Sequence, residues 1–102
     1  MKKILLACSS GMSTSLLVTK MEEYARSIGD EAKIWAVGQD QAKKEMDQAH
    51  VVLIGPQMSF LKNELQKEAD KYGIRVDVID MAAYGMADGK KAYEQAISLI
   101  GD

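Results

Sequence analysis

The sequence is poor in cysteine, histidine and proline, with one of each among 102 residues. A single cysteine excludes an internal disulfide and a Cys-x-x-Cys redox centre. One cysteine and one histidine cannot supply the three or four ligands of a zinc site, so we expect no metal and no cofactor. An excess of positive charge is also lacking, because 13 basic residues face 15 acidic ones. We therefore expect no nucleic-acid partner.

Long apolar runs are absent as well. The longest, Ile4–Ala7 and Val51–Ile54, are far shorter than the roughly 20 residues that span a bilayer, so we expect no direct membrane insertion. The opening Met1–Cys8 mimics a lipoprotein signal, with basic residues and an apolar run before a cysteine. Apolar regions of signal peptides run about 7 to 15 residues, so we expect a cytoplasmic protein that starts directly on a buried strand.

The overall composition is that of an ordinary globular chain. Hydrophobic residues make up 47% and charged residues 27% of the sequence, which excludes a disordered chain, a coiled coil and a collagen-like repeat. A chain of this length forms one core, and we expect a single domain over residues 1–102.

Short β-rich apolar runs alternate with longer segments of helical period. The expected strands are Lys3–Ala7, Lys33–Val37, Val51–Ile54 and Arg75–Ile79. Four helices are expected from their apolar stripes. Leu17, Met21, Tyr24 and Ile28 precede Gly29 in the first helix, and Leu61, Leu65, Ala69 and Tyr72 precede Gly73 in the third. A weaker second helix over Gln39–Ala49 has Ala42, Met46 and Ala49 as its apolar edge, and a last helix, with Asp88 as N-cap and Gly101 after it, carries Tyr93, Ala96, Ile97 and Ile100. This alternation is typical of an α/β protein.

Nearly continuous apolar strands predict a four-stranded parallel sheet with helices on both faces. For so short a chain we expect the strand order 2-1-3-4 of flavodoxin-like and low-molecular-weight-phosphatase-like folds. Ligands bind such sheets at the carboxyl ends of the strands, where the chain order reverses. The segment after Ala7 is therefore the expected site.

That segment, Cys8–Ser15, holds one thiol, one glycine and five hydroxyl side chains in eight residues. Gly11 allows the backbone to curl so that successive N–H groups form an anion-binding nest, and the positive end of the following helix adds to the field. These groups also stabilise a thiolate, so we expect Cys8 to have a lowered pKa and to be a nucleophile. A lone cysteine at a strand end is often a small buried hydrophobe, but such a residue needs no glycine and hydroxyls after it.

Two other phosphate-binding motifs do not fit this segment. It lacks the Gly-x-x-x-x-Gly-Lys-Ser/Thr pattern of a nucleoside-triphosphate loop. A low-molecular-weight cysteine phosphatase has this strand, loop and helix order, but it carries an arginine six residues after the cysteine. Thr14 occupies that position here, so no guanidinium stabilises the transition state and we expect weak hydrolysis of phosphate monoesters.

Three stretches resemble one known family. The sequences of Cys8–Val18, Val51–Gln57 and Val78–Met86 are similar to those of the IIB component of the phosphoenolpyruvate-dependent sugar phosphotransferase system, in its lactose/cellobiose (chitobiose) branch. The resemblance extends over essentially the whole chain. It implies that Cys8 is a phosphocysteine intermediate, and that the phosphate-binding loop comprises Ser9, Ser10, Gly11, Met12, Ser13, Thr14 and Ser15.

The resemblance also implies partners. Cys8 would take a phosphoryl group from a phosphohistidine of the IIA component and pass it to a β-linked disaccharide of the cellobiose, lactose or chitobiose type held by the membrane IIC component. Both partners would meet the same exposed thiol, one at a time, and we expect the chain to be a monomer. The sugar itself is not readable from this sequence, because its contacts belong to IIC.

Several other residues have two interpretations each. Of the seven methionines, Met12, Met58, Met81 and Met86 follow expected strand ends and form either an apolar docking collar or packing at helix edges. Asp80 is expected to cap or turn the chain rather than act as a general acid, and Tyr84 lines the site or packs. Pro56 and Gln57 are expected to form one wall of the site, and Trp35 and Phe60 to take part in core or edge packing. His50 is expected to be a structural or surface residue far from Cys8.

Two other functions remain open from the sequence. A small cysteine phosphatase or arsenate-reductase-like enzyme would share the fold, but Thr14 argues against it. A passive anion-sensing module would use the same cradle with a cysteine that is never modified.

Overall fold

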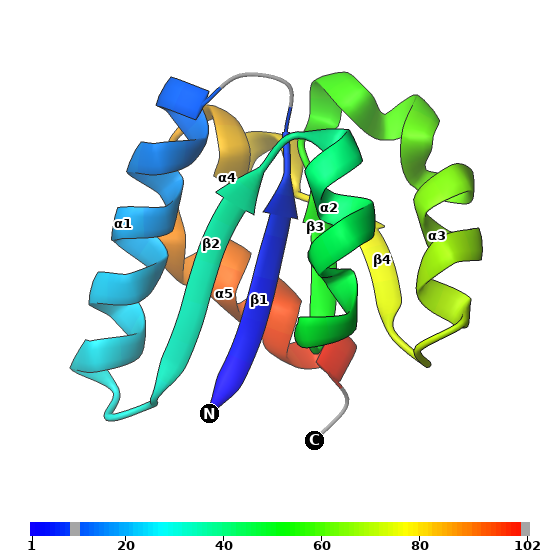
Figure 1. Ribbon diagram of the computed structural model, residues 1–102. Coiled ribbons are helices and arrows are strands. Elements are labelled where there is room, and N and C mark those ends of the chain that lie inside the picture. The colour runs from blue at the N-terminus through cyan, green and yellow to red at the C-terminus, as the bar shows by residue number, and fades with distance from the viewer. Residues whose placement is uncertain (9–10, 101–102) are drawn as a thin grey trace.

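The computed structural model describes residues 1–8 and 11–100, and for residues 11–14 it describes the backbone alone. A four-stranded parallel sheet in the order β2-β1-β3-β4 forms its centre (Figure 1). The strands are β1 (Lys2–Ala7), β2 (Ala32–Val37), β3 (Val51–Ile54) and β4 (Arg75–Val78). The predicted fold class, strand order and parallel pairing are confirmed, with strand bounds that differ by one residue at three ends.

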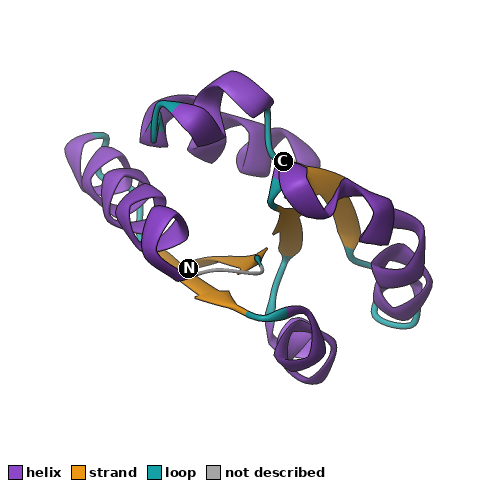
Figure 2. Cartoon of the chain, turned by 90° about the horizontal axis from the view of Figure 1, so that it is seen from above, coloured by secondary structure: helices purple, strands orange, loops and turns teal. Residues whose placement is uncertain are grey.

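Helices cover both faces of the sheet, as expected (Figure 2). They are α1 (Gly11–Ser27), α2 (Gln39–Glu45), α3 (Lys62–Asp70), α4 (Met81–Gly85) and α5 (Gly89–Ile100), with 3-10 segments at Met46–Gln48 and Pro56–Leu61. Helices α1, α4 and α5 lie on one face, while α2 and α3 lie on the other. Every parallel crossover therefore places a helix over the apolar strands.

The side chains of β1 point alternately to the two faces of the sheet and so belong to two separate cores. Ile4 and Leu6 pack with α1 and α5, whereas Leu5 and Ala7 pack with α2 and α3, and all four are fully buried. Successive side chains of a strand point to opposite faces, so an uninterrupted apolar run places β1 inside the molecule with both faces covered. This central strand carries Cys8 at its end.

Helix ends follow the predicted chemistry. Gly29 and Gly73 adopt left-handed φ values of 77° and 68° after α1 and α3, and the Asp88 carboxylate accepts a hydrogen bond from the Lys91 N–H at 3.1 Å at the start of α5. Gly101 lies outside the described residues. The ends of two predicted apolar stripes, Ile28 and Tyr72, are half exposed, and both lie in the turns that follow α1 and α3.

Two expected helix bounds were wrong, and one helix was missed. The weaker helix expected over Gln39–Ala49 ends at Glu45 and continues as a 3-10 segment over Met46–Gln48. The segment up to Ser15 was expected to be loop, but α1 already begins at Gly11. Serine and threonine are tolerated in a first turn, whose N–H groups have no partner within the helix. The short helix α4 was not predicted. Its signal was present, since Asp80 precedes two alanines and its carboxylate accepts the Ala83 N–H at 3.0 Å.

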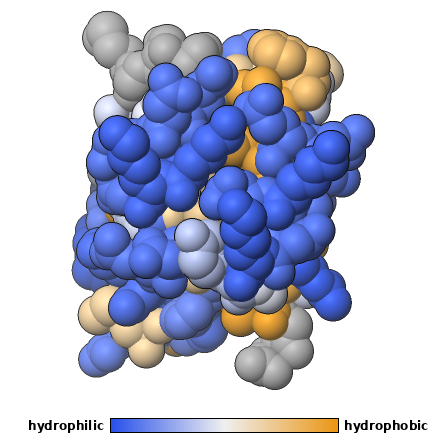
Figure 3. All heavy atoms as spheres, turned by 45° about the vertical axis from the view of Figure 1, so that its right-hand side comes forward, coloured by the Kyte–Doolittle hydropathy of each residue, from blue (hydrophilic) through white to orange (hydrophobic). Residues whose placement is uncertain are grey.

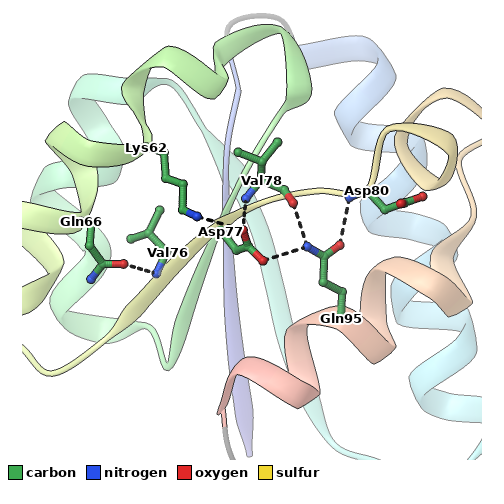
Figure 4. A network of polar contacts seen from close by, with 7 residues as sticks. All are labelled: Lys62, Gln66, Val76, Asp77, Val78, Asp80 and Gln95. Carbon is green, nitrogen blue, oxygen red and sulfur yellow. Dashed lines mark hydrogen bonds and ion pairs between the residues drawn. The ribbon is translucent and has the colours of Figure 1, made fainter.

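The edge strand β4 is held by side chains from both layers of helices (Figure 4). From α3, Gln66 Oε1 accepts the Val76 N–H at 2.9 Å. From α5, Gln95 donates from Nε2 to the Val78 carbonyl at 2.7 Å and accepts the Asp80 N–H on Oε1 at 2.9 Å. The backbone groups at this edge thus have partners, and the start of α4 is tied to α5.

Within the described part of the chain, none of the helices combines the length and apolar character needed to traverse a bilayer.

Candidate functional site

Cys8 lies at the carboxyl end of β1, where the chain order of the sheet reverses. Its N–H donates to the Val37 carbonyl of β2 at 3.0 Å, and on the other side the Gly55 N–H after β3 donates to the Ala7 carbonyl at 3.1 Å. Hydrogen bonds from both neighbouring strands therefore fix the backbone around the thiol. Cys8 is only 5% exposed, so the expectation of an exposed thiol was wrong. The reason is its place at the end of a central strand, with neighbouring chain on both sides.

The backbone of Gly55 approaches the sulfur closely. A Cβ at this position would stand 3.2 Å from Cys8 Sγ and 2.9 Å from Gln57 Oε1. Such distances are shorter than ordinary van der Waals contacts, so only glycine leaves both groups in place. Pro56 and Gln57 follow in a 3-10 segment, and the predicted wall beside Cys8 is present.

Tyr84 completes this side of the site. Gln57 Nε2 donates to Tyr84 Oη at 3.1 Å, which joins the segment after β3 to the helix α4 after β4. Tyr84 is partly buried and packs against the α1 and α5 core. The expected packing of Tyr84 is confirmed, and its hydroxyl contacts Gln57. Asp80 is the N-cap of α4, which confirms its structural role.

Helix α1 begins three residues after Cys8, and its N-terminus lies at the same edge of the sheet as the end of β1 (Figure 1). The first N–H groups of a helix lack partners within it and carry partial positive charge, which favours an anion or a thiolate at this end. Ser9 and Ser10, and the side chains of Met12, Ser13 and Thr14, lie outside the described residues. Ser15 is exposed, and its carbonyl accepts from the Thr19 hydroxyl at 3.1 Å within α1.

Four large apolar side chains are exposed on elements that start or end near this edge. We call them the apolar rim: Leu16 is 52%, Phe60 77%, Met81 75% and Met86 78% exposed. Figure 3 shows hydrophobic side chains at the upper right and along the lower edge of a face that is otherwise mostly hydrophilic. Of the two interpretations of these methionines, the exposure of Met81 and Met86 agrees with a collar, whereas the burial of Met58 agrees with packing.

The expectation of core or edge packing was wrong for Phe60, whereas Met58 follows the packing interpretation. Met58 is 4% exposed and packs with the α2 and α3 core, while Phe60 lies on the surface. Met58 interrupts the 3-10 segment with φ −116° and ψ 21°, and this kink decides which side chain turns inward. Trp35 packs against the same core as expected, and its Nε1 donates to Glu45 at 2.9 Å.

The remaining titratable candidate lies elsewhere. His50 is exposed at the start of β3, at the opposite edge of the sheet from Cys8, and its Nδ1 accepts the Lys3 N–H at 3.1 Å. Its expected surface role is confirmed. No group of three or more metal-ligating side chains occurs in residues 1–8 and 11–100.

Comparison with known proteins shows the family. Residues 3–95 match the family described as "PTS system, Lactose/Cellobiose specific IIB subunit". The chain belongs to this family. It is therefore a IIB component of a sugar-transporting phosphotransferase system, which confirms the resemblance seen in the sequence.

Relatives of this IIB component extend along its whole length. It is 81% identical over 100 residues, 98% of the chain and 97% of the relative, to an oligo-β-mannoside-specific EIIB component of Bacillus subtilis. It is 40% identical over 104 residues, 97% of the chain and 96% of the relative, to a cellobiose-specific EIIB component of Lactococcus lactis. A lactose-specific EIICB component of Streptococcus mutans is 29% identical over 91 residues, which are 87% of the chain and 16% of that protein.

Solved structures support the fold. A lactose-specific IIB domain from Streptococcus pneumoniae superposes with a TM-score of 0.85 at 16% identity, covering 96% of each chain. A cellobiose-specific IIB component from Borrelia burgdorferi gives 0.80 at 36% identity, covering 97% of this chain and 91% of that one.

Proposed function

We propose that Cys8 relays a phosphoryl group. The thiolate attacks the phosphorus of a phosphohistidine on the IIA component, the N–P bond breaks, an S–P bond forms, and the proton lost by the thiol balances the one gained by the imidazole. A sugar hydroxyl then attacks the same phosphorus, the S–P bond breaks, and the hydroxyl proton returns to the sulfur. The observation that carries the proposal is the position of Cys8 between the end of β1 and the N-terminus of α1.

A relay must hold the phosphoryl group without hydrolysing it. Backbone N–H groups and hydroxyls from Ser9 to Ser15 suit that task, because they stabilise phosphoryl oxygens without activating water. The loop has Thr14 where a cysteine phosphatase has arginine, and this favours a stable phosphocysteine over an esterase. The phosphatase alternative predicts turnover of p-nitrophenyl phosphate, which we expect to be near zero.

The partners in this proposal are a IIA donor and a membrane IIC component with bound sugar, which place the chain in the cytoplasm. The fused EIICB relative supports the pairing with IIC. The names of the relatives support a β-linked disaccharide or oligosaccharide, including β-mannosides, as the final acceptor. The apolar rim supports brief docking on the edge that holds Cys8, over an interface below about 1,200 Å².

The test is the intact mass of the protein after incubation with phosphorylated IIA. We expect one added phosphoryl group on the wild type and none on Cys8→Ser, because a serine hydroxyl stays protonated where a thiolate would form. Matched melting curves check that the variant is folded. A wild-type mass that never changes would leave the passive anion-sensing module as the better description, and transfer by Cys8→Ser at a substantial rate would overturn the assignment.

A further inference from the structure

The Gln57 amide lies between the thiol and a tyrosine. A Cβ placed on Gly55 would stand 2.9 Å from the oxygen Oε1 of Gln57 and 3.2 Å from the sulfur of Cys8. The separation of oxygen and sulfur is therefore at most the sum of these two distances. The nitrogen Nε2 of Gln57 is turned to Tyr84 Oη at 3.1 Å. The amide therefore presents its acceptor to the side of the sulfur and its donor to the tyrosine.

This orientation suits only one state of the cysteine. A thiol is a weak donor, so an acceptor oxygen beside it is compatible with S–H. A phosphoryl group on the sulfur carries acceptor oxygens with negative charge, which an amide oxygen would repel. A half turn about the last side-chain bond of glutamine exchanges oxygen and nitrogen with little change of shape, because this torsion has two broad minima.

Tyr84 is the partner that permits both orientations. A phenol hydroxyl can accept from Nε2 or donate to Oε1, so the Gln57–Tyr84 hydrogen bond persists when the amide turns. Its position is well supported, because Asp80 caps α4 and Gln95 holds the Asp80 N–H at 2.9 Å. The hydroxyl is thus carried by a ring that packs against the core and by a helix whose start is tied to α5.

We infer that Gln57 contacts the transferred phosphoryl group by donating a hydrogen bond from Nε2, after its amide turns about the Tyr84 hydroxyl. Gln57 acts directly on the phosphoryl oxygens, and Tyr84 is a positioning residue. The inference rests on the proposed function, because it assumes that Cys8 becomes phosphorylated. It adds a side-chain donor on β3's side of the site to the backbone donors at the start of α1.

Two variants of Gln57 separate a donor from a mere neighbour. Gln57→Glu keeps the shape but offers only acceptors, and Gln57→Leu removes hydrogen bonding without adding charge. We expect both to take up the phosphoryl group from IIA about tenfold more slowly or worse, since each lacks a charge-assisted hydrogen bond. The matched control is Gln48→Glu, the same charge change on an exposed residue near the opposite edge, which should transfer at the wild-type rate. If Gln57→Leu also transfers at the wild-type rate, the inference is wrong.

The role of Tyr84 has its own test. Tyr84→Phe should slow uptake less than the Gln57 variants, and Tyr84→Phe combined with Gln57→Leu should be no slower than Gln57→Leu alone, because the tyrosine acts through the amide. Tyr72→Phe, on an exposed tyrosine at the other edge, is the control. A double variant with additive losses would contradict the positioning role.

A direct readout is the side-chain NH₂ signal of Gln57 in a ¹⁵N-labelled protein. Phosphorylation should shift this signal strongly, whereas that of Gln48 should stay in place. A Gln57 signal that does not move on a protein whose mass shows full phosphorylation would overturn the inference but leave the relay standing. A wild type that gains no phosphoryl group would instead overturn the proposed function on which it rests.

Discussion

The backbone of Gly55 lies so close to Cys8 that a methyl group on Gly55 would stand 3.2 Å from the sulfur. The two residues directly follow neighbouring strands that pair in parallel, and the Gly55 N–H donates to the carbonyl of the residue before the cysteine. The contact leaves little space on this side of the thiol. It also makes residue 55 a sensitive probe of the site, since any side chain there displaces either the sulfur or Gln57.

Gly55→Ala should impair transfer more than it impairs folding. The added methyl meets Gln57 Oε1 at 2.9 Å, and this flexible side chain can move away, so we expect a loss of stability of about 1 to 2 kcal/mol. The rate of phosphoryl uptake should fall about tenfold, because the amide and the sulfur leave their positions. Gly38→Ala is the matched control after β2, where nothing lies within 4 Å of the added methyl. Single-turnover rates and urea unfolding of both variants check this; equal rates in the two would contradict it.

Asp80 variants distinguish a helix cap from a general acid. Asp80→Asn retains an acceptor for the Ala83 N–H, so stability and transfer should stay near wild type. Asp80→Ala removes the cap and should cost about 1 kcal/mol of stability. A general acid would make the asparagine variant as slow as the alanine variant. Melting curves and transfer rates at several pH values decide between the two.

Charges on the apolar rim should affect docking and not folding. Phe60→Asp and Met86→Asp alter side chains that are 77% and 78% exposed, so melting temperatures should hardly change. Transfer from IIA should slow, because the new charge becomes buried and unpaired only in the complex. Tyr72→Asp, on an exposed aromatic at the other edge, is the control. Wild-type rates in both rim variants would rule out the rim as the docking surface.

Met58→Asp should behave differently from the rim variants. Met58 is 4% exposed within the α2 and α3 core, so a carboxylate there is desolvated without a partner. We expect a loss of more than about 4 kcal/mol, enough to unfold a domain of this size. Circular dichroism of the purified variant checks this. A variant that melts like wild type would place Met58 on the surface after all.

The alkaline stability of the protein should depend on Tyr93. Burial, helped by its hydrogen bond to the Asp30 carboxylate at 3.0 Å, raises the pKa of Tyr93 from 10.0 to about 12. The folded state therefore keeps the phenol proton more tightly than the unfolded state, so this contribution is present below pH 10 and is lost as the pH rises towards 12. Tyr93→Phe should be less stable at pH 8 and lose this part of the dependence between pH 10 and 11. Urea midpoints measure it, with Tyr72→Phe expected to follow the wild-type curve.

The sequence was sufficient for the fold and for the central residue of the site. Four short apolar runs separated by helical segments leave a parallel sheet with both faces covered as the stable arrangement, and the run Ile4–Ala7 is buried throughout. Cys8 follows that run directly, so its place at the carboxyl edge of the sheet was predictable from order alone. These features are local or periodic, and a periodic pattern is visible in one dimension.

Only the tertiary structure decided which side chains meet around the thiol. Gln57 and Tyr84 are 27 residues apart and belong to elements after two different strands, so no spacing in the chain predicts their hydrogen bond. The burial of Met58 and the exposure of Phe60 were also not visible in the sequence. A short kinked 3-10 segment has neither the helical nor the strand period, so only its packing against the α2 and α3 core shows which side chain is buried.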